Sequence, residues 1–119
     1  MAMILLPDRD WLLGRCDARL EAMFTGGAIE EASAVLARTD ILPAAPVRMA
    51  IGVPEIASVL AGTSTLQQAL AAAQLATRQY AKRQFTWFRN QPPAMWHRSD
   101  ATETCAALEE FVTRFHYET

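Results

Sequence analysis

The feature that most constrains the fold is a stretch of 25 residues, positions 65–89, that contains neither glycine nor proline. Its apolar residues recur at helical spacing, and its start is rich in alanine, a strong helix former. Ser64 and Gln67 have the spacing of a capping box, which marks a helix start. Pro92 and Pro93 prevent the helix from continuing. The sequence therefore predicts one long helix from about Thr65 to Arg89, the longest element of the chain.

Four shorter segments also show helical periodicity with start or stop residues at their ends. They are residues 9–25, 28–39, 54–62 and 100–116. Asp8 is suited to cap the first of them, and Asp100 with Glu103 forms a capping box for the last. Residues 40–53 are predicted to be a loop. The sequence thus predicts a mainly α fold of about five helices.

One further segment, Met3 to Leu6, is an apolar run of the length of a buried strand. No second strand is recognisable elsewhere in the chain. A lone buried strand would leave its backbone groups unpaired, which is costly. We therefore expect Met3-Leu6 either to be disordered or to be at most one residual strand of a sheet encoded upstream.

The length and composition describe one globular body. A chain of 119 residues, of which 51% are hydrophobic and 20% charged, is expected to form a single domain over residues 1–119. The uncharged residues 56–77 are interrupted by polar side chains, which argues against a membrane span. Cys16 and Cys105 lack metal-ligand spacing, and the N-terminus lacks a signal-peptide pattern. We expect a cytoplasmic location, no membrane partner and no metal site in this chain.

The charges are unevenly distributed although the net charge is only −2. No acidic residue lies between Glu55 and Asp100, whereas Arg78, Lys82 and Arg89 fall on one narrow stripe of the long helix. The simpler interpretation is a solvated helix face, and periodicity alone favours it. The alternative is an anion site, because arginine matches phosphate oxygens and aromatic rings between basic residues can stack on unpaired nucleotides.

The opposite arc of the long helix is predicted to face the core, with Tyr80, Trp87 and Phe88 inward. Gln84 lies within this arc. A buried amide without hydrogen-bond partners costs about 1–3 kcal/mol. Its position therefore indicates a polar partner, or a cavity that holds a ligand.

Three sequence segments carry a resemblance to a known family. The first is Tyr80-Ala81-Lys82-Arg83-Gln84-Phe85-Thr86-Trp87-Phe88-Arg89, preceded by Thr77-Arg78-Gln79. The second is Ala50-Ile51-Gly52-Val53-Pro54-Glu55-Ile56, followed by Leu60-Ala61-Gly62. The third, a weaker match, comprises Arg19, Met23-Phe24, Gly26-Gly27, Glu30-Glu31 and Leu36. In this order and spacing, the segments resemble the C-terminal portion of the tRNA dimethylallyltransferases, also called tRNA isopentenyltransferases.

The resemblance implies an enzyme with a P-loop-type α/β core. Family members transfer a dimethylallyl group from dimethylallyl diphosphate to the exocyclic amine of the adenosine beside the anticodon. The full-length family is expected to use Mg²⁺. The adenosine is flipped out of the tRNA anticodon stem-loop, and the matched segments are where the family touches that RNA. Such a base needs stacking and edge contacts.

Carried over by position, the resemblance assigns tRNA contacts to two segments. They are Met49, Ala50, Ile51, Gly52, Val53 and Pro54 in the first, and Lys82, Arg83, Gln84, Phe85, Thr86, Trp87, Phe88 and Arg89 in the second. Arg48 and Arg78 are candidate phosphate contacts. Gly52 is expected to let a backbone approach closely.

Two features depart from the family pattern. The family often has arginine directly before Ala-Ile-Gly, where this chain has Met49, with Arg48 one position earlier. The Gly-rich phosphate-binding loop and the catalytic Asp of the family are not matched here, and neither Asp8 nor Asp10 is assigned that role. The resemblance therefore implies prenyl-transfer chemistry for the enzyme, with no catalytic residue in this chain and no activity of the chain alone.

Two hypotheses for the function remain. The first is that the chain is a C-terminal part of a tRNA dimethylallyltransferase, without its P-loop core. The second is a free-standing, non-catalytic helical module that binds RNA or another protein. Under the first, an apolar flank is expected to be exposed along Trp11 and Leu12 or on the Trp87 side, with self-association through it.

Overall fold

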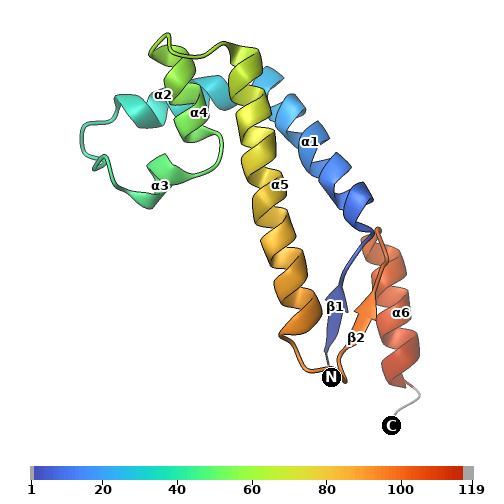
Figure 1. The fold of residues 1–119 in the computed structure, drawn as a ribbon. Helices are drawn as coiled ribbons and strands as arrows, with labels where there is room; N and C mark the ends of the chain where they lie inside the picture. The colour runs from blue at the N-terminus through green and yellow to red at the C-terminus, as the bar shows by residue number, and fades with distance from the viewer. Residues whose placement is uncertain (1, 117–119) are drawn as a thin grey trace. The chain divides into compact units, whose positions relative to one another are not determined.

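The fold is mainly α, as the sequence predicts. The computed structural model describes residues 2–116 (Figure 1). Its elements follow in the order β1 (Met3–Leu5), α1 (Arg9–Thr25), α2 (Ala28–Ala37), α3 (Pro46–Met49), α4 (Val53–Leu60), α5 (Leu66–Asn90), β2 (His97–Ser99) and α6 (Thr104–His116). Within residues 2–116 the structure has six helices where about five were expected, and the additional one, α3, is a single turn inside the predicted loop.

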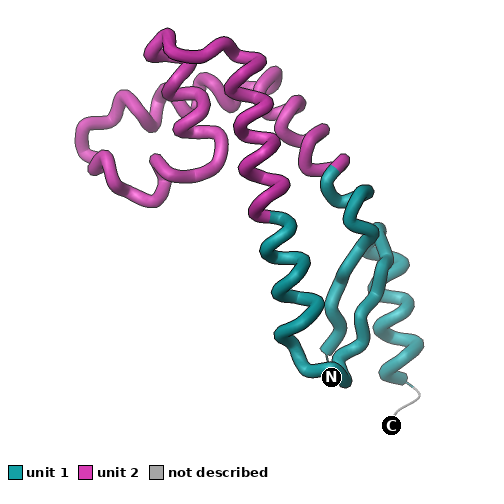
Figure 2. Tube along the Cα trace, viewed as in Figure 1, with its two compact units in different colours: residues 1–13, 81–119 teal, residues 14–80 magenta. Residues whose placement is uncertain are grey.

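The chain divides into two compact units (Figure 2). Unit 1 comprises residues 1–13 and 81–119, and unit 2 comprises residues 14–80. The boundaries fall inside helices α1 and α5, so they do not coincide with linkers between elements. A single domain over residues 1–119 therefore stays a prediction.

The core of unit 2 is a cluster of small and aliphatic side chains around one aromatic ring. Its buried members are Leu20, Phe24, Ala32, Ile56, Ala69 and Ala73. Helix α4 packs against α2 and α3, which places Ile56 at the centre with only 2% of its surface exposed. Burying such a side chain stabilises the fold by about 1.5–3 kcal/mol.

Unit 1 contains a two-stranded parallel sheet, so the expectation of at most one strand was wrong. Met3 lies opposite His97 and Leu5 opposite Ser99. The Leu6 N–H also donates to the Ser99 carbonyl at 2.7 Å. Strand β2 could not be recognised from the sequence because it is short and polar, His-Arg-Ser, and has no apolar run.

Helix α6 is joined to β2 by a carboxylate. Glu110 accepts hydrogen bonds from the Ser99 hydroxyl and from the His97 ring. These bonds, with Ser99 as the larger cause, hold the pKa of Glu110 below its usual range. Ser99 is buried, and its hydroxyl also accepts the Ala101 N–H at 3.2 Å. This network fixes the helix that follows the sheet.

Two of the predicted helix caps are shifted. The Asp8 carboxylate accepts the Trp11 N–H at 3.0 Å, which confirms the cap of α1. The capping box of α5 is formed by Thr65 and Gln68, with bonds of 2.9 and 3.1 Å, rather than by the preceding pair. Helix α6 begins at Thr104, four residues after Asp100, so Asp100 does not occupy its N-cap.

Candidate nucleic-acid interface

The first predicted contact segment, residues 49–54, lies in unit 2 and comprises the last residue of α3, the turn after it and the first two residues of α4. Gly52 has a φ of 103° and precedes α4 directly. Its N–H donates to the Glu55 carboxylate at 2.8 Å. A Cβ at this position would meet nothing within 4 Å. The positive φ by itself favours glycine at this position, and the close approach to RNA expected from the sequence stays a prediction.

Side chains on either side of this turn are exposed and apolar. Met49 is exposed, and so is Ile51. Residues 50–53 line a hollow of about 220 Å³, together with Met23, Val35 and other apolar side chains. Glu31 is the charged residue in its lining. The segment thus offers an apolar surface with one carboxylate at its side.

The two candidate phosphate contacts, Arg48 and Arg78, are both engaged within unit 2. The Arg78 guanidinium forms a two-point ion pair with Asp17, with Nε donating to Oδ1 at 3.1 Å. This pair raises the pKa of Arg78. The inference that no acid lies against Arg78 was wrong, because Asp17 comes from α1, which is distant in sequence. Arg48 donates only to backbone carbonyls in the described structure, including Ile41 O at 2.9 Å.

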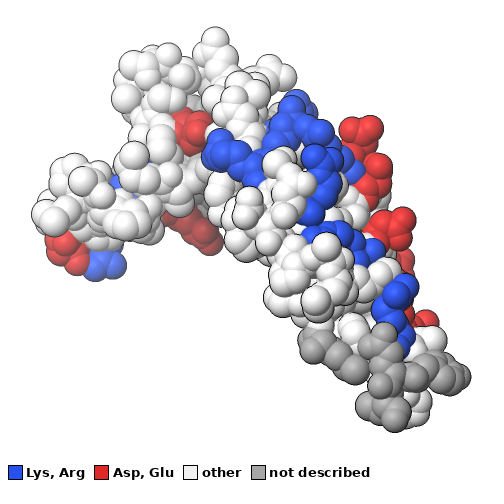
Figure 3. Space-filling view, turned by 60° about the horizontal axis from the view of Figure 1, so that its bottom comes forward, with Lys and Arg blue, Asp and Glu red and all other residues white. Residues whose placement is uncertain are grey.

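The second predicted contact segment, residues 82–89, lies in unit 1 on the last turns of α5. All of its side chains are exposed except Phe85, which is half-buried. Across residues 2–116, no carboxylate forms an ion pair with Lys82 or Arg89. Figure 3 shows Lys and Arg side chains exposed on one face of the molecule.

A hollow of about 410 Å³ runs along the exposed face of this segment. Its lining combines cations, an indole ring and hydrogen-bonding side chains, namely Lys82, Arg83, Thr86, Trp87, Asn90 and Gln91. We call this surface the basic hollow. Cations suit phosphates, and an exposed ring suits an unstacked base.

The same tryptophan also borders a second, apolar hollow of about 660 Å³ in unit 1. It is lined by Met3, Ile4, Leu5, Trp87, Phe88, Gln91, Pro92, Pro93 and Trp96. The Trp87 and Phe88 rings meet edge to face with centroids 5.0 Å apart. Trp87 is 55% exposed and Trp11 39% exposed, as expected of an apolar flank, whereas Leu12 is half-buried. Self-association through it stays a prediction.

The core-facing arc of α5 was predicted wrongly in its second half. Gln84 is exposed, so the argument from a buried amide fails. Tyr80, Trp87 and Phe88 were expected inward and are exposed, whereas Phe85, which was not placed in that arc, is half-buried. The inward stripe follows every fourth residue and therefore slants around the helix, because four residues turn the chain by about 400°. An arc drawn at one constant angle along the whole helix therefore assigns the wrong residues to the core in its second half.

The sequence alone does not indicate a role for Arg98. In the structure its guanidinium donates to four carbonyls at the end of α5 and in the turn after it. They are Arg89 O at 3.2 Å, Pro92 O at 3.0 Å, Pro93 O at 3.3 Å and Trp96 O at 2.8 Å. These bonds fix the turn that carries the lower wall of the apolar hollow.

Neither a metal cluster nor a membrane-spanning helix is found in the described part of the chain. Across residues 2–116, no group of three or more His, Cys, Asp or Glu side chains could hold a metal ion. Within the same range, no helix is both long enough and apolar enough to cross a membrane.

The chain resembles known proteins over most of its length. The tRNA dimethylallyltransferase of Sphingopyxis alaskensis is 65% identical over 96 residues, which are 81% of this chain and 31% of that protein. That of Novosphingobium aromaticivorans is 54% identical over 98 residues, 82% of this chain and 34% of the relative. The chain thus spans about a third of the length of the curated relatives it matches.

Two solved structures share the fold. The tRNA delta(2)-isopentenylpyrophosphate transferase of Staphylococcus epidermidis matches 99% of this chain with a TM-score of 0.82 and 25% identity, and the match covers 38% of that structure. The tRNA isopentenylpyrophosphate transferase of Bacillus halodurans matches 97% with a TM-score of 0.79 and 32% identity, again covering 38%. A family model described as IPP transferase matches residues 1–91, and the chain therefore belongs to the IPP transferase family.

Proposed function

We propose that this chain supplies a tRNA-binding part of a tRNA dimethylallyltransferase. In the proposed reaction, the exocyclic amine of the adenosine beside the anticodon forms a bond to the allylic carbon of dimethylallyl diphosphate. The carbon–oxygen bond to the diphosphate breaks, the diphosphate leaves with the electron pair, and the amine loses a proton. We assign RNA binding, and no bond-making step, to the residues described here.

The observation that carries the proposal is the basic hollow on α5. Lys82 lies at its rim without an ion pair among the described residues, so its charge is available to an RNA phosphate. Trp87 presents an exposed ring for base stacking, and Thr86, Asn90 and Gln91 offer hydrogen bonds. This combination suits a single-stranded loop, whose bases are unstacked and whose phosphates are spaced along a groove.

Segment 49–54 is proposed as a second contact. Its exposed Met49 and Ile51 offer apolar surface rather than charge, so we expect it to contribute shape and base contacts. We further propose that dimethylallyl diphosphate and Mg²⁺ act elsewhere in the enzyme, because no residue here is matched to its phosphate-binding loop. The proposed tRNA substrate implies work in the cytoplasm.

The test measures binding of the purified chain to an anticodon stem-loop RNA across a range of salt concentrations. Lys82→Ala with Arg89→Ala should lower the salt slope by about 1.4, at roughly 0.7 per lost phosphate contact on single strands. At 0.1 M salt this corresponds to about 25-fold weaker binding. Arg9→Ala with Arg114→Ala removes the same charge from exposed positions on α1 and α6 and should leave the slope nearly unchanged.

Each outcome separates the two functional hypotheses. Prenyl transfer to the stem-loop by the purified chain, supplied with dimethylallyl diphosphate, would contradict the assignment of binding alone. Equal slopes for the two double variants would show that Lys82 and Arg89 are only part of a solvated helix face. Binding that discriminates poorly between the anticodon stem-loop and an unrelated hairpin of equal charge would favour a general RNA-binding module.

A further inference from the structure

Helix α2 ends at Ala37 without a basic residue in its last turn. The last carbonyls of a helix have no partners within it, and the negative end of the helix dipole favours a cation nearby. The Arg38 N–H donates to Val35 O at 3.2 Å. The Leu36 carbonyl receives a hydrogen bond from Nη1 of Arg48, at 3.4 Å. A cation from α3 therefore caps α2.

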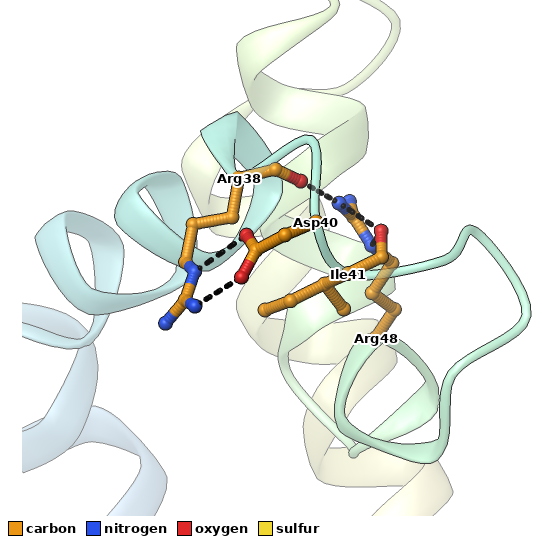
Figure 4. A network of polar contacts seen from close by, with 4 residues as sticks. All are labelled: Arg38, Asp40, Ile41 and Arg48. Carbon is orange, nitrogen blue, oxygen red and sulfur yellow. Dashed lines mark hydrogen bonds and ion pairs between the residues drawn. The ribbon is translucent and has the colours of Figure 1, made fainter.

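The same guanidinium binds the turn that follows α2. Nη2 of Arg48 donates to Arg38 O at 2.6 Å and to Ile41 O at 2.9 Å, and Nε donates to Ile41 O at 3.2 Å. Figure 4 shows these bonds beside the ion pair of Arg38 and Asp40. Arginine has five N–H donors and no acceptor, so most of its fork is already used within the chain.

Arg48 directly precedes the segment proposed to contact tRNA. The Arg48 N–H donates to Ala45 O at 2.9 Å, and the Val53 N–H donates to Ala50 O at 3.0 Å. The start of segment 49–54 is thus held from one side by the α3 backbone and from the other by the Arg48 side chain.

We propose that Arg48 is a positioning residue: its guanidinium clamps residues 36–41 to α3 and thereby sets the conformation of segment 49–54, instead of contacting an RNA phosphate. The proposal rests on the proposed function of that segment. A phosphate could take this fork only by displacing three backbone carbonyls, of Leu36, Arg38 and Ile41. Arg48, which lies one position earlier than the arginine of the family pattern, thus has hydrogen-bond partners within this chain.

Arg38 provides a matched control. It lies in the same turn and carries the same charge, but its side chain is 61% exposed and pairs with Asp40, itself 64% exposed. Such surface ion pairs contribute little to stability. Arg38→Ala removes the same charge without removing the clamp.

The experiment compares the salt dependence of stem-loop binding for the wild-type chain, Arg48→Ala, Arg48→Lys and Arg38→Ala. A clamp predicts that Arg48→Ala weakens binding about five- to tenfold while the salt slope stays unchanged. Arg48→Lys should weaken it similarly, because an ammonium keeps the charge but cannot fork onto several carbonyls. Arg38→Ala should bind like the wild type. A phosphate contact predicts instead a slope lower by about 0.7 for Arg48→Ala and near-normal binding for Arg48→Lys.

Amide hydrogen exchange of the free chain tests the clamp without RNA. Arg48→Ala and Arg48→Lys should speed exchange at the N–H groups of Ala45, Arg48 and Val53, while the amides of α5 remain protected. Wild-type protection of those three amides in both variants, or a lowered salt slope, would overturn the inference. If α5 also loses protection in Arg48→Ala, that variant is destabilised as a whole, and the exchange pattern of Arg48→Lys then decides whether the clamp exists. If the wild-type chain binds no RNA, the proposed function fails, and the exchange pattern still decides the clamp.

Discussion

Substitution of Trp87 can distinguish the contribution of the basic hollow to RNA binding from the contribution of the apolar hollow. It lines both hollows of unit 1, and its ring is 55% exposed. Trp96 lines the apolar hollow alone. Replacing each tryptophan by alanine therefore removes an indole from the apolar hollow in both cases, but from the basic hollow only in Trp87→Ala.

The magnitude follows from what the Trp87 ring touches. Stacking on one base contributes about 1–3 kcal/mol, so Trp87→Ala should weaken stem-loop binding by about 5- to 150-fold. The salt slope should not change, because no charge is removed. In the free chain the ring loses its edge-to-face contact with Phe88, which contributes about 0.5–1.5 kcal/mol. For a chain of 119 residues this corresponds to a melting temperature lower by about 2–6 °C.

The assay is fluorescence anisotropy of a labelled anticodon stem-loop, titrated with the wild type, Trp87→Ala, Trp87→Phe and Trp96→Ala, with thermal melting of each protein in parallel. Trp87→Phe keeps a ring and should retain most of the affinity, whereas Trp96→Ala should bind like the wild type. Equal losses in Trp87→Ala and Trp96→Ala would refute the reasoning, because the apolar hollow would then account for both effects. Unchanged binding in Trp87→Ala would likewise refute the reasoning, because it would show that the Trp87 ring does not contact the RNA.

Two further predictions concern stability. Gly52→Ala forces an L side chain into a φ of 103° and should destabilise the chain by about 1–3 kcal/mol. Gly14→Ala places a side chain in open space on α1 and should stabilise the chain by about 0.5–1 kcal/mol. Chemical unfolding of both variants measures these free energies, and equal effects of the two substitutions would contradict the prediction. Because the pKa of Glu110 is lowered in the folded state, its contribution to stability is present above the ordinary carboxyl value of 4.5 and is lost as the pH falls through the folded pKa. Glu110→Gln should remove this acid dependence, and urea midpoints that vary with pH in the same way in both proteins would show that the network with Ser99 and His97 contributes nothing.

Local signals predicted the helices well. The absence of glycine and proline from residues 65–89, and the prolines after them, located α5 to within a residue at each end. Asp8 capped α1, as its position before the apolar pattern indicated. These features depend on neighbours within a few residues, which the sequence displays directly.

Features that depend on distant partners were not predictable. Asp17 reaches Arg78 from a different helix, and Arg48 finds carbonyls ten residues or so away, so neither guanidinium could be recognised as engaged. Strand β2 is defined only by its pairing with β1. For the candidate site, the resemblance supplied segments 49–54 and 82–89, but only the structure distinguishes exposed Gln84 and Trp87 from half-buried Phe85.

The pairing of β1 with β2 has a consequence for how the chain acquires its structure during synthesis. Met3 can pair with His97 only after His97 has been synthesised, 94 positions later (97 − 3 = 94), so the parallel ladder cannot form before then. At about 5–20 residues added per second, the first strand leaves the ribosome roughly 5–20 s before its partner. Throughout that interval β1 lacks this partner, whereas the helices of residues 14–80 can already assemble. Pairing of β1 with β2 is therefore expected to follow the assembly of those helices.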